Sequence, residues 1–528
     1  MPRTTPELPP GMDPAGRVLE PKAPKADPVA GVLMGLAGLV GLLVFVRLGR
    51  PSLWIDEVLT WMDAHAQGGN YNRLGYFIVR KTVELLGGEP SEAALRLAPA
   101  LAGWLAIPAT AWAFLPLAGA RRAALAALFV ACSPWQLYWA QNARFYTFVE
   151  LAGLVGVGAL LRGLAVPEAR RALVWLAAGL ACLAAGALFQ LQSLLVLAAF
   201  VVALLVVRPG RQALAAATGV GPRPGGAAAP LDAAQRARRV ALVWRLGVAA
   251  AVLLAALAVP AERVFARYML AKKGGGLGDA LGALLALGNT IRPSFGAAFL
   301  VGAVYAARQR AGLFAALVPT FGAAVVVALG FLTKTTAQYA FAFLPWIALV
   351  AAWPVGPGRA SGPGSPKGWG RSCAWAFLVG APLWSASLLQ VGPGYGDRPR
   401  WREAVAHIEA GLQPGDLVLS LPAPPAEFYM SRGHVARGAA DADRARLRPG
   451  RLATRVGVLD SFNPSIFERP ARDGRPMWIV LRTDYLLTWP PADRARLVAF
   501  LRDECRLDAR FPVRVEARDL DLEVWRRD

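Results

Sequence analysis

Two adjacent carboxylates, Asp56 and Glu57, follow directly on the first long apolar segment of the chain. A carboxylate near the hydrocarbon boundary of a membrane costs roughly several kcal/mol unless it is paired or takes part in chemistry. The functional interpretation is a general base that accepts a proton from a hydroxyl group. The bland alternative is a solvated loop whose acids face water. Adjacent side chains diverge in a helix or a strand, so we expect the two carboxylates to do different jobs.

A second polar cluster lies at 133–146, where aromatic residues, amides and Arg144 stand between two apolar segments. As structure alone, this pattern is an aromatic belt at the membrane interface with a snorkelling arginine. As a site, it places Arg144 against a lipid phosphate. The aromatic residues that would pack a sugar or an isoprenoid are Trp135, Tyr138 and Trp139.

Other cations lie in or beside apolar segments. Arg96 is either an interfacial anchor or the buried partner of the carboxylate pair. Lys334 could present an ammonium group to a phosphate, although a lysine at a helix end is common without a ligand. Lys272 and Lys273, followed by three glycines, form a basic loop.

The elements that position these residues are membrane helices. With 528 residues, 55% hydrophobic content and a mean hydropathy of +0.41, the chain is too apolar for a soluble protein. We predict an α-helical polytopic membrane protein with about eleven spans. The predicted spans are 28–48, 93–117, 123–140, 145–163, 172–188, 190–207, 240–258, 279–306, 311–331, 337–353 and 372–391.

Charge and cysteine content narrow the functional class. The formal charge of +22 would suggest a nucleic-acid partner for a soluble protein, but here much of the arginine lies in short connections, where it orients helices. We therefore expect no nucleic-acid partner. The four cysteines show no metal-binding spacing, and the Asp56–Glu57 pair lacks a full ligand set for a divalent cation. We expect no resident cofactor, and metal dependence stays open.

The arginine-bearing connections predict the orientation of the chain. Residues 1–27, rich in proline and charge, are expected to form a disordered cytosolic tail, and 28–48 a retained span rather than a cleaved signal peptide. The arginines of the connections then fall on the cytosolic face, together with the linkers 208–239 and 355–371. The Asp56 segment and the carboxyl-terminal region share the opposite, extracytoplasmic face.

Two segments outside the spans have patterns of their own. Residues 72–86 are amphipathic and are expected to lie along the membrane interface. Beyond the membrane domain of 28–391, mixed polar and apolar residues predict a soluble α/β domain over 395–528. The pattern there indicates helices at 401–412 and 493–502, strands at 416–420 and 477–482, and partial alternation at 513–524.

The order of several short motifs resembles the GT-C glycosyltransferases. More narrowly, it is similar to the bacterial branch that includes protein O-mannosyltransferases and the aminoarabinose transferase of lipid A. The matching motifs are Trp54-Ile55-Asp56-Glu57, Leu95-Arg96 followed by Pro99 and Gly103, Ser133-Pro134 leading to Gln141-Asn142-Ala143-Arg144-Phe145-Tyr146, Tyr339 near Pro345, and Trp401-Arg402 with Pro414-Gly415-Asp416.

The resemblance implies an inverting transfer of a hexose or pentose from a polyprenyl-phosphate donor to a hydroxyl of a protein, lipid or glycan acceptor. It implies Asp56 as the base, with Glu57 ordering Asp56 or binding the acceptor. It also implies a multi-pass protein of the bacterial inner (plasma) membrane, in contact with membrane lipids. The residues assigned to donor phosphate and lipid binding are Arg96, Gln141, Arg144, Tyr146, Lys334 and Tyr339.

Two alternatives from other classes stay open. A transporter or flippase of polyprenyl-linked glycans would also need intramembrane charge, and it would show inverted repeats and helices broken near the midplane. A noncatalytic scaffold that displays the carboxyl-terminal domain would leave the clustered charges without a role. The chain also departs from the family pattern, with uncharged residues where relatives carry His, Glu or Arg. These residues are Asn142, Gln190 and Gln338.

Overall fold

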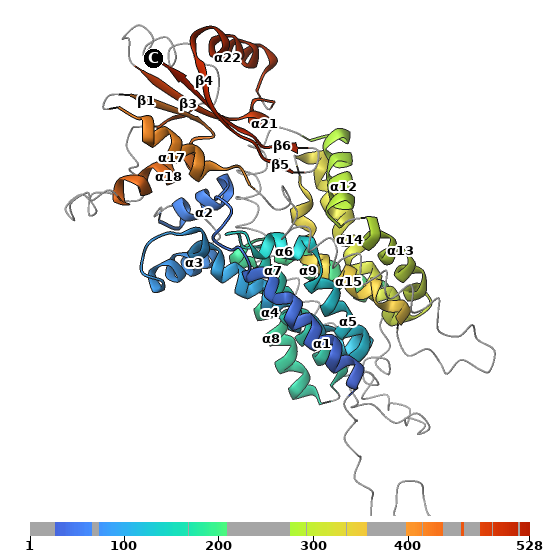
Figure 1. Ribbon diagram of the computed structural model, residues 1–528. Coiled ribbons are helices and arrows are strands. Elements are labelled where there is room, and N and C mark those ends of the chain that lie inside the picture. Colours follow the sequence, from blue (N-terminus) through green and yellow to red (C-terminus); the bar gives the residue numbers. More distant parts are fainter. Residues whose placement is uncertain are drawn as a thin grey trace, which may run out of the picture.

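The computed structural model describes most of the chain. The described residues are 27–65, 73–166, 168–207, 275–291, 293–333, 335–355, 398–413, 416–436, 456–458, 476–487, 489–515 and 518–528. A bundle of helices carries a sheet with its own helices at one end (Figure 1). The predicted spans 240–258 and 372–391, the amino-terminal tail of residues 1–26 and most of both linkers lie outside the described residues.

Six helices among the described residues are long and apolar enough to cross a membrane. Their 18 to 27 residues correspond to about 27–40 Å at about 1.5 Å per residue, against a hydrocarbon core of about 30 Å. They are α1 (Pro28–Gly41) continued by η1 (Leu42–Phe45), α4 (Glu92–Ala118), α7 (Tyr146–Ala165), α8 (Ala169–Phe189), α14 (Arg310–Leu332), and the run of η2 (Ala337–Phe343), α15 (Leu344–Ala351) and η3 (Trp353–Val355).

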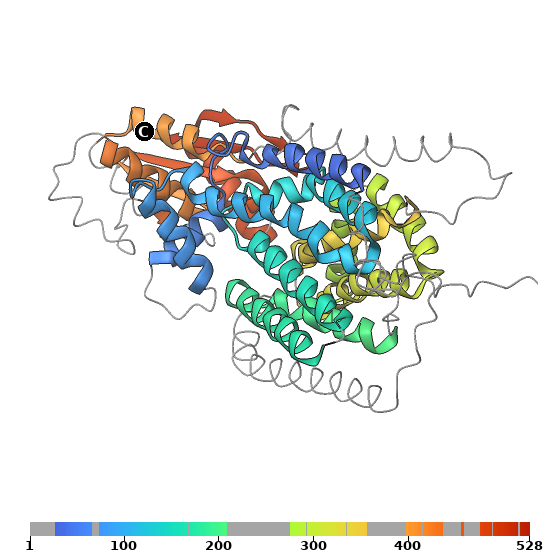
Figure 2. The same ribbon diagram turned by 90° about the horizontal axis from the view of Figure 1, so that it is seen from below.

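The helices pack around a core of small and aromatic side chains. Helix α7 lies between α4 and α8, and α1 lies on the outside of the bundle against α4 and α5 (Ala120–Ala131), as Figures 1 and 2 show. Small residues permit this close approach: a Cβ added at Gly156 would meet Leu183 at 2.7 Å, and one at Gly103 would meet Ala140 at 2.7 Å. Small residues at helix contacts are the usual means of helix packing in membranes.

Two predicted spans are each divided into two helices. The predicted span 123–140 consists of α5 and α6 (Pro134–Ala140), bent by 61°. Ser133 before the second helix is extended because a proline disfavours the helical conformation in the preceding residue. The predicted span 279–306 consists of α12 (Leu277–Ile291) and α13 (Pro293–Ala307), with the second helix again beginning at a proline. These two, like α9 (Gln192–Val206), are apolar but shorter than a full span, and the total of eleven spans stays a prediction.

Two short helices lie across the end of the bundle. Helix α2 (Ile55–His65) contains the carboxylate pair, so the solvated loop that was the bland alternative is a helix here. Helix α3 (Arg73–Leu85) lies within the predicted amphipathic segment 72–86. It buries Val79 and Val83, while Phe77 is exposed. Both helices lie between the bundle and the carboxyl-terminal domain (Figure 1).

The carboxyl-terminal domain is a mixed five-stranded sheet with strand order β2-β1-β3-β7-β4. Strands β2 (Val456–Val458), β1 (Leu417–Leu421) and β3 (Met477–Arg482) are parallel; β7 (Leu522–Arg527) pairs antiparallel with β3, and β4 (Arg506–Phe511) pairs antiparallel with β7. A two-stranded hairpin, β5 (Arg514–Val515) and β6 (Arg518–Asp519), occupies part of the segment predicted to alternate. The helices are α17 (Trp401–Gly411), α18 (Ala423–Ala436), α21 (Thr483–Leu486) and α22 (Pro491–Glu504).

Alternate residues of the central strands bury two different faces. Ile479 and Leu481 pack with Leu497 of α22 on one face, whereas Trp478 and Val480 pack in the cluster that includes α17. This is the period of two expected for a sheet covered on both sides. The arrangement brings α17 and α18 toward the membrane domain, where they contact the segment before α2.

Candidate active site

Glu57 lies in the first turn of α2 and is fully buried. Its carboxylate accepts hydrogen bonds from Arg96 Nε at 2.8 Å, from Arg96 Nη2 at 2.8 Å and from the Ala143 backbone N–H at 2.8 Å. Arg398 of the carboxyl-terminal domain donates to the same carboxylate through Nη1. Burial alone would raise the pKa of Glu57, but the charges of Arg398 and Arg96 and these hydrogen bonds lower it to about 2.

Arg96 is also fully buried and binds the segment that leads into α2. Its Nη1 donates to the carbonyl oxygens of Leu48 at 2.9 Å and Pro51 at 2.8 Å, and its Nη2 donates to that of Ser52 at 3.0 Å. Together with the two bonds to Glu57, these use all five N–H groups of a guanidinium. Arg96 is therefore the buried partner of Glu57, and this geometry corrects its assignment to the donor phosphate because no N–H is left for one.

Asp56 differs from Glu57 in its burial and in the absence of an ion pair among the described residues. Its side chain is half-buried, and within the described part of the chain no hydrogen bond occupies its carboxylate. Its backbone carbonyl accepts hydrogen bonds from Thr60 Oγ1 at 2.9 Å and from Arg144 Nη1 at 3.3 Å. The helix thus directs one carboxylate into an ion-pair cluster and leaves the other available to bind a proton.

Arg144 and Tyr146 lie beside Asp56. Arg144, which is half-buried, also donates to Thr60 Oγ1 at 3.1 Å, so its guanidinium lies along the first turn of α2. The buried phenol of Tyr146 lies next to Gln190 and within electrostatic range of Asp56, Arg144 and Tyr339. Helix η2, which carries Tyr339, packs against α7. Arg144 and Tyr146 therefore lie near Asp56, and Tyr339 lies near Tyr146.

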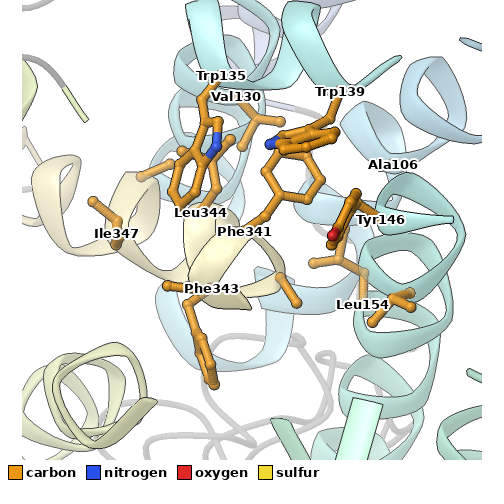
Figure 3. Packing of buried hydrophobic residues seen from close by; sticks show 14 of the residues in the cluster. Ala106, Val130, Trp135, Trp139, Tyr146, Leu154, Phe341, Phe343, Leu344 and Ile347 are labelled. Carbon is orange, nitrogen blue, oxygen red and sulfur yellow. The ribbon is translucent and has the colours of Figure 1, made fainter. Parts of the chain in front are cut away.

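An aromatic cluster lines the membrane side of this group. The ring centroids of Trp139 and Tyr146 are 4.2 Å apart, and Phe341 lies 5.4 Å from Trp135 and 6.4 Å from Trp139. Figure 3 shows these rings converging from α6, α7 and η2. Apolar rings at this depth suit an isoprenoid chain as well as they suit the helix core.

Gln141, predicted to bind the donor, binds the end of the first span in the structure. Its Nε2 donates to the carbonyl oxygens of Val46 at 2.6 Å and of Leu43 and Val44 at 3.3 Å. It therefore fastens α1 and η1 to the 141–144 turn. Lys334, Lys272 and Lys273 lie outside the described residues. Within the described residues, no group of three His, Cys, Asp or Glu side chains could hold a metal ion.

Two residues at the site were absent from the sequence-based set. Arg398 donates through Nη2 to the Gln141 carbonyl at 2.9 Å as well as to Glu57. Tyr485 of α21 lies near enough to Asp56 to feel its charge. Burial raises the pKa of Tyr485, and the charges of Asp56 and Asp484 raise it further, against the lowering effect of Arg482. Both residues come from the carboxyl-terminal domain, and no local pattern relates them to Asp56.

Comparison with known proteins supports the fold assignment. No model of a known protein family and no sequence among the curated proteins matches the chain. The structure of ArnT from Cupriavidus metallidurans bound to undecaprenyl phosphate is similar over 95% of this chain and 98% of that one, with 17% identity and a TM-score of 0.50.

Oligosaccharyltransferase structures from Archaeoglobus fulgidus are also similar. One, tethered to an acceptor peptide, covers 87% of this chain and 69% of its own, with 11% identity and a TM-score of 0.52. Another, AglB in complex with an inhibitory peptide and a dolichol-phosphate, covers 86% and 69%, with 12% identity and a TM-score of 0.51. The chain therefore has the polytopic helical fold of the GT-C membrane enzymes.

Proposed function

We propose that the protein is an inverting glycosyltransferase that moves a sugar from a polyprenyl-phosphate donor to an acceptor hydroxyl on the extracytoplasmic face of the membrane. The observation that carries this proposal is the divergence of the two carboxylates. The carboxylate of Glu57 forms ion pairs with two arginines. Asp56 lies beside Arg144, and its carboxylate accepts no hydrogen bond from the described residues. The fold shared with ArnT and AglB supports it.

The proposed reaction begins with the acceptor hydroxyl hydrogen-bonded to Asp56. Asp56 takes the proton while the hydroxyl oxygen attacks the anomeric carbon from the side opposite the phosphate. The bond between that carbon and the phosphate oxygen breaks, and the phosphate leaves with the bonding electrons. The products are the glycosylated acceptor with inverted configuration, the polyprenyl phosphate and a protonated Asp56.

Arg144 is the cation proposed to meet the growing charge on the phosphate. A preorganised donor of this kind contributes about 3–4 kcal/mol to the transition state. Lys334 is proposed as a second cation from its position in the sequence, five residues before Tyr339. Tyr146 and Tyr339, with the aromatic cluster beneath them, are proposed to flank the lipid-linked sugar.

The proposed orientation follows from the distribution of arginine. The carboxylate pair and the carboxyl-terminal domain lie at the same end of the bundle (Figure 1). The ends of helices assigned to the cytosolic face carry arginine: Arg121 and Arg122 in the first turn of α5, Arg310 at the start of α14, and Arg308 just before it. On this basis, and from the resemblance, we place the chain in the bacterial inner membrane with its site facing outward, where the lipid-linked donor and a protein, lipid or glycan acceptor can both reach it.

Transfer in proteoliposomes tests the proposal. Mass spectrometry of lipid-linked sugars in a deletion strain would identify the donor, since that polyprenyl-phosphate sugar should accumulate. With the labelled donor, Asp56→Asn should reduce turnover by about 10²-fold or more while donor binding persists. The matched control is Asp63→Asn on the same helix, where Asp63 accepts a hydrogen bond from Tyr76 at 3.0 Å and should be dispensable for turnover.

Two outcomes would count against the proposal. Near-normal turnover by a folded Asp56→Asn variant would remove the base assignment. Absence of transfer by the wild type with every donor tested, combined with movement of the lipid-linked sugar across the bilayer, would favour the transporter. The bent pair α5–α6 is the feature of the fold that a transporter would share.

A further inference from the structure

The carboxyl-terminal domain supplies a buried guanidinium to the helix that carries Asp56. Arg398 is 8% exposed and lies over the ring of Tyr138, with its charged carbon 5.5 Å from the ring centroid. One of its terminal nitrogens donates to the Glu57 carboxylate and the other to the Gln141 carbonyl. A single side chain therefore joins the first turn of α2 to the turn that carries Arg144.

Further contacts from the same domain hold the residues just before α2. The hydroxyl of Tyr429 accepts a hydrogen bond from the Leu53 N–H at 2.6 Å and donates to the Glu92 carboxylate at 3.0 Å. Arg402 donates through Nη2 to the Arg50 carbonyl at 2.6 Å. The carboxylate of Glu403 accepts a further hydrogen bond from Ser52 Oγ at 3.4 Å. Segment 48–57 is thus held by Arg96 on one side and by four residues of the carboxyl-terminal domain on the other.

The carboxylate of Glu57 has two buried cationic partners. Glu57 and Arg96 form a doubly hydrogen-bonded pair that is fully buried. Arg398 is a second buried cation bound to the same carboxylate, and buried Glu92 supplies a further negative charge near Arg96. Arg398 differs from Arg96 in its second partner, the Gln141 carbonyl. Because the forked guanidinium is rigid, this pair of bonds fixes the position of the first turn of α2 relative to the 141–144 turn.

We propose that Arg398 is a positioning residue for the transfer, acting through Glu57 and the Gln141 carbonyl. By this grip the carboxyl-terminal domain sets Asp56 relative to Arg144, and the catalytic geometry is complete only when that domain is docked. The effect on turnover rests on the proposed function. The grip itself does not, and it has a measurement of its own.

The variant that tests this is Arg398→Gln in the full-length protein. Because the Glu57–Arg96 pair that remains is balanced in charge, the chain should fold. Amide hydrogen exchange at Leu53 and Trp54, whose N–H groups bond to Tyr429 and Glu57, should accelerate about tenfold or more. Turnover at saturating donor should fall about 10–100-fold, the scale of a small misplacement, with the donor KM within about twofold of the wild type.

Two companion variants sharpen the test. Arg398→Lys keeps the charge but cannot grip both partners in the same fork, so its turnover and exchange should lie between those of the wild type and Arg398→Gln. Arg400→Gln is the matched control. Arg400 lies two residues away, is exposed and pairs with Glu403 on the surface at 3.5 Å, so both readouts should stay at the wild-type level.

Each outcome decides the proposal. Unchanged exchange and turnover in Arg398→Gln, or equal losses in Arg400→Gln, would overturn it, as would a loss expressed only in donor KM. If Arg398→Gln does not fold, Arg398→Lys carries the test, and exchange and turnover at the wild-type level in that variant would overturn the proposal. If the wild type transfers no sugar, the proposed function fails, and the exchange measurement still decides whether Arg398 holds α2.

Discussion

Replacing Glu57 with Gln removes the carboxylate that two buried guanidinium groups share. Arg96 is fully buried and Arg398 is 8% exposed, so neither guanidinium can turn to water. The amide oxygen of Gln keeps one acceptor, but its NH₂ group faces the N–H donors of the arginines. Leaving a buried charge without its partner costs about 3–5 kcal/mol. That is a third or more of the typical stability of a protein, which is about 5–15 kcal/mol.

This loss should appear as a lower melting temperature. A destabilisation of 1 kcal/mol shifts Tm by about 2–4 °C in a domain of 150–250 residues and by less in a longer chain, so we expect a decrease of about 5–10 °C. The measurement is the fraction of detergent-solubilised protein that stays monodisperse on size-exclusion chromatography after heating. The control is Glu84→Gln on α3, where Glu84 pairs with exposed Arg80 and Lys81 and the expected effect is a few tenths of a kcal/mol, about 0.5 at most.

The double variant Glu57→Gln with Arg398→Gln tests the electrostatic reasoning most directly. It removes one of the two cations that lose the Glu57 carboxylate, so it should melt above Glu57→Gln alone, even though it carries an additional substitution. A double variant that melts below both single variants would refute the argument from charge. A Glu57→Gln protein that melts within about 2 °C of Glu84→Gln would refute the assigned magnitude.

Three other expectations follow from the same geometry. Arg144→Ala should weaken binding of radiolabelled polyprenyl phosphate and Arg144→Lys should restore part of it; equal binding by both variants and the wild type would place the phosphate elsewhere. Because the pKa of Glu57 is lowered from 4.5 to about 2, its contribution to stability is complete above pH 4.5 and is lost as the pH falls toward 2, so the Tm of the wild type should decrease more steeply in that window than the Tm of Glu57→Gln. In a cysteine-free background, Asp503→Cys should react with an impermeant thiol reagent from outside and Gln309→Cys only from the cytosol; labelling of both from one side would disprove the orientation.

The sequence was sufficient for the elements whose signal is local. Strand 477–482 agrees with β3 residue for residue, strand 416–420 differs from β1 by one residue, and the segment 72–86 contains α3. Hydropathy alone did not divide the spans 123–140 and 279–306, because it counts apolar residues and ignores direction. The prolines at 134 and 293, each at the start of a helix, were the available signal.

The site residues assigned from the sequence stay predictions, and the structure shows how some of them lie. Arg144 and Tyr146 lie near Asp56, and Tyr339 lies near Tyr146. The engagement of every N–H of Arg96 depends on how the chain turns before α2, which no periodicity encodes. The position of Glu57 beside an apolar segment indicated that its carboxylate would need a partner. No sequence pattern indicated that Arg398, from the carboxyl-terminal domain, would be a second partner beside Arg96.

The separation of Glu57 and Arg398 along the chain also sets the interval between their synthesis on the ribosome. Arg398 follows Glu57 by 341 residues, so at about 5–20 residues per second the ribosome adds it about 20–70 s later. Of the two arginines that bind Glu57, Arg96 follows it by only 39 residues and is therefore made long before Arg398. On the proposal made above for Arg398, a nascent chain at this stage lacks the side chain that positions α2. The proposed transfer would therefore begin only after the carboxyl-terminal domain has been synthesised and has folded.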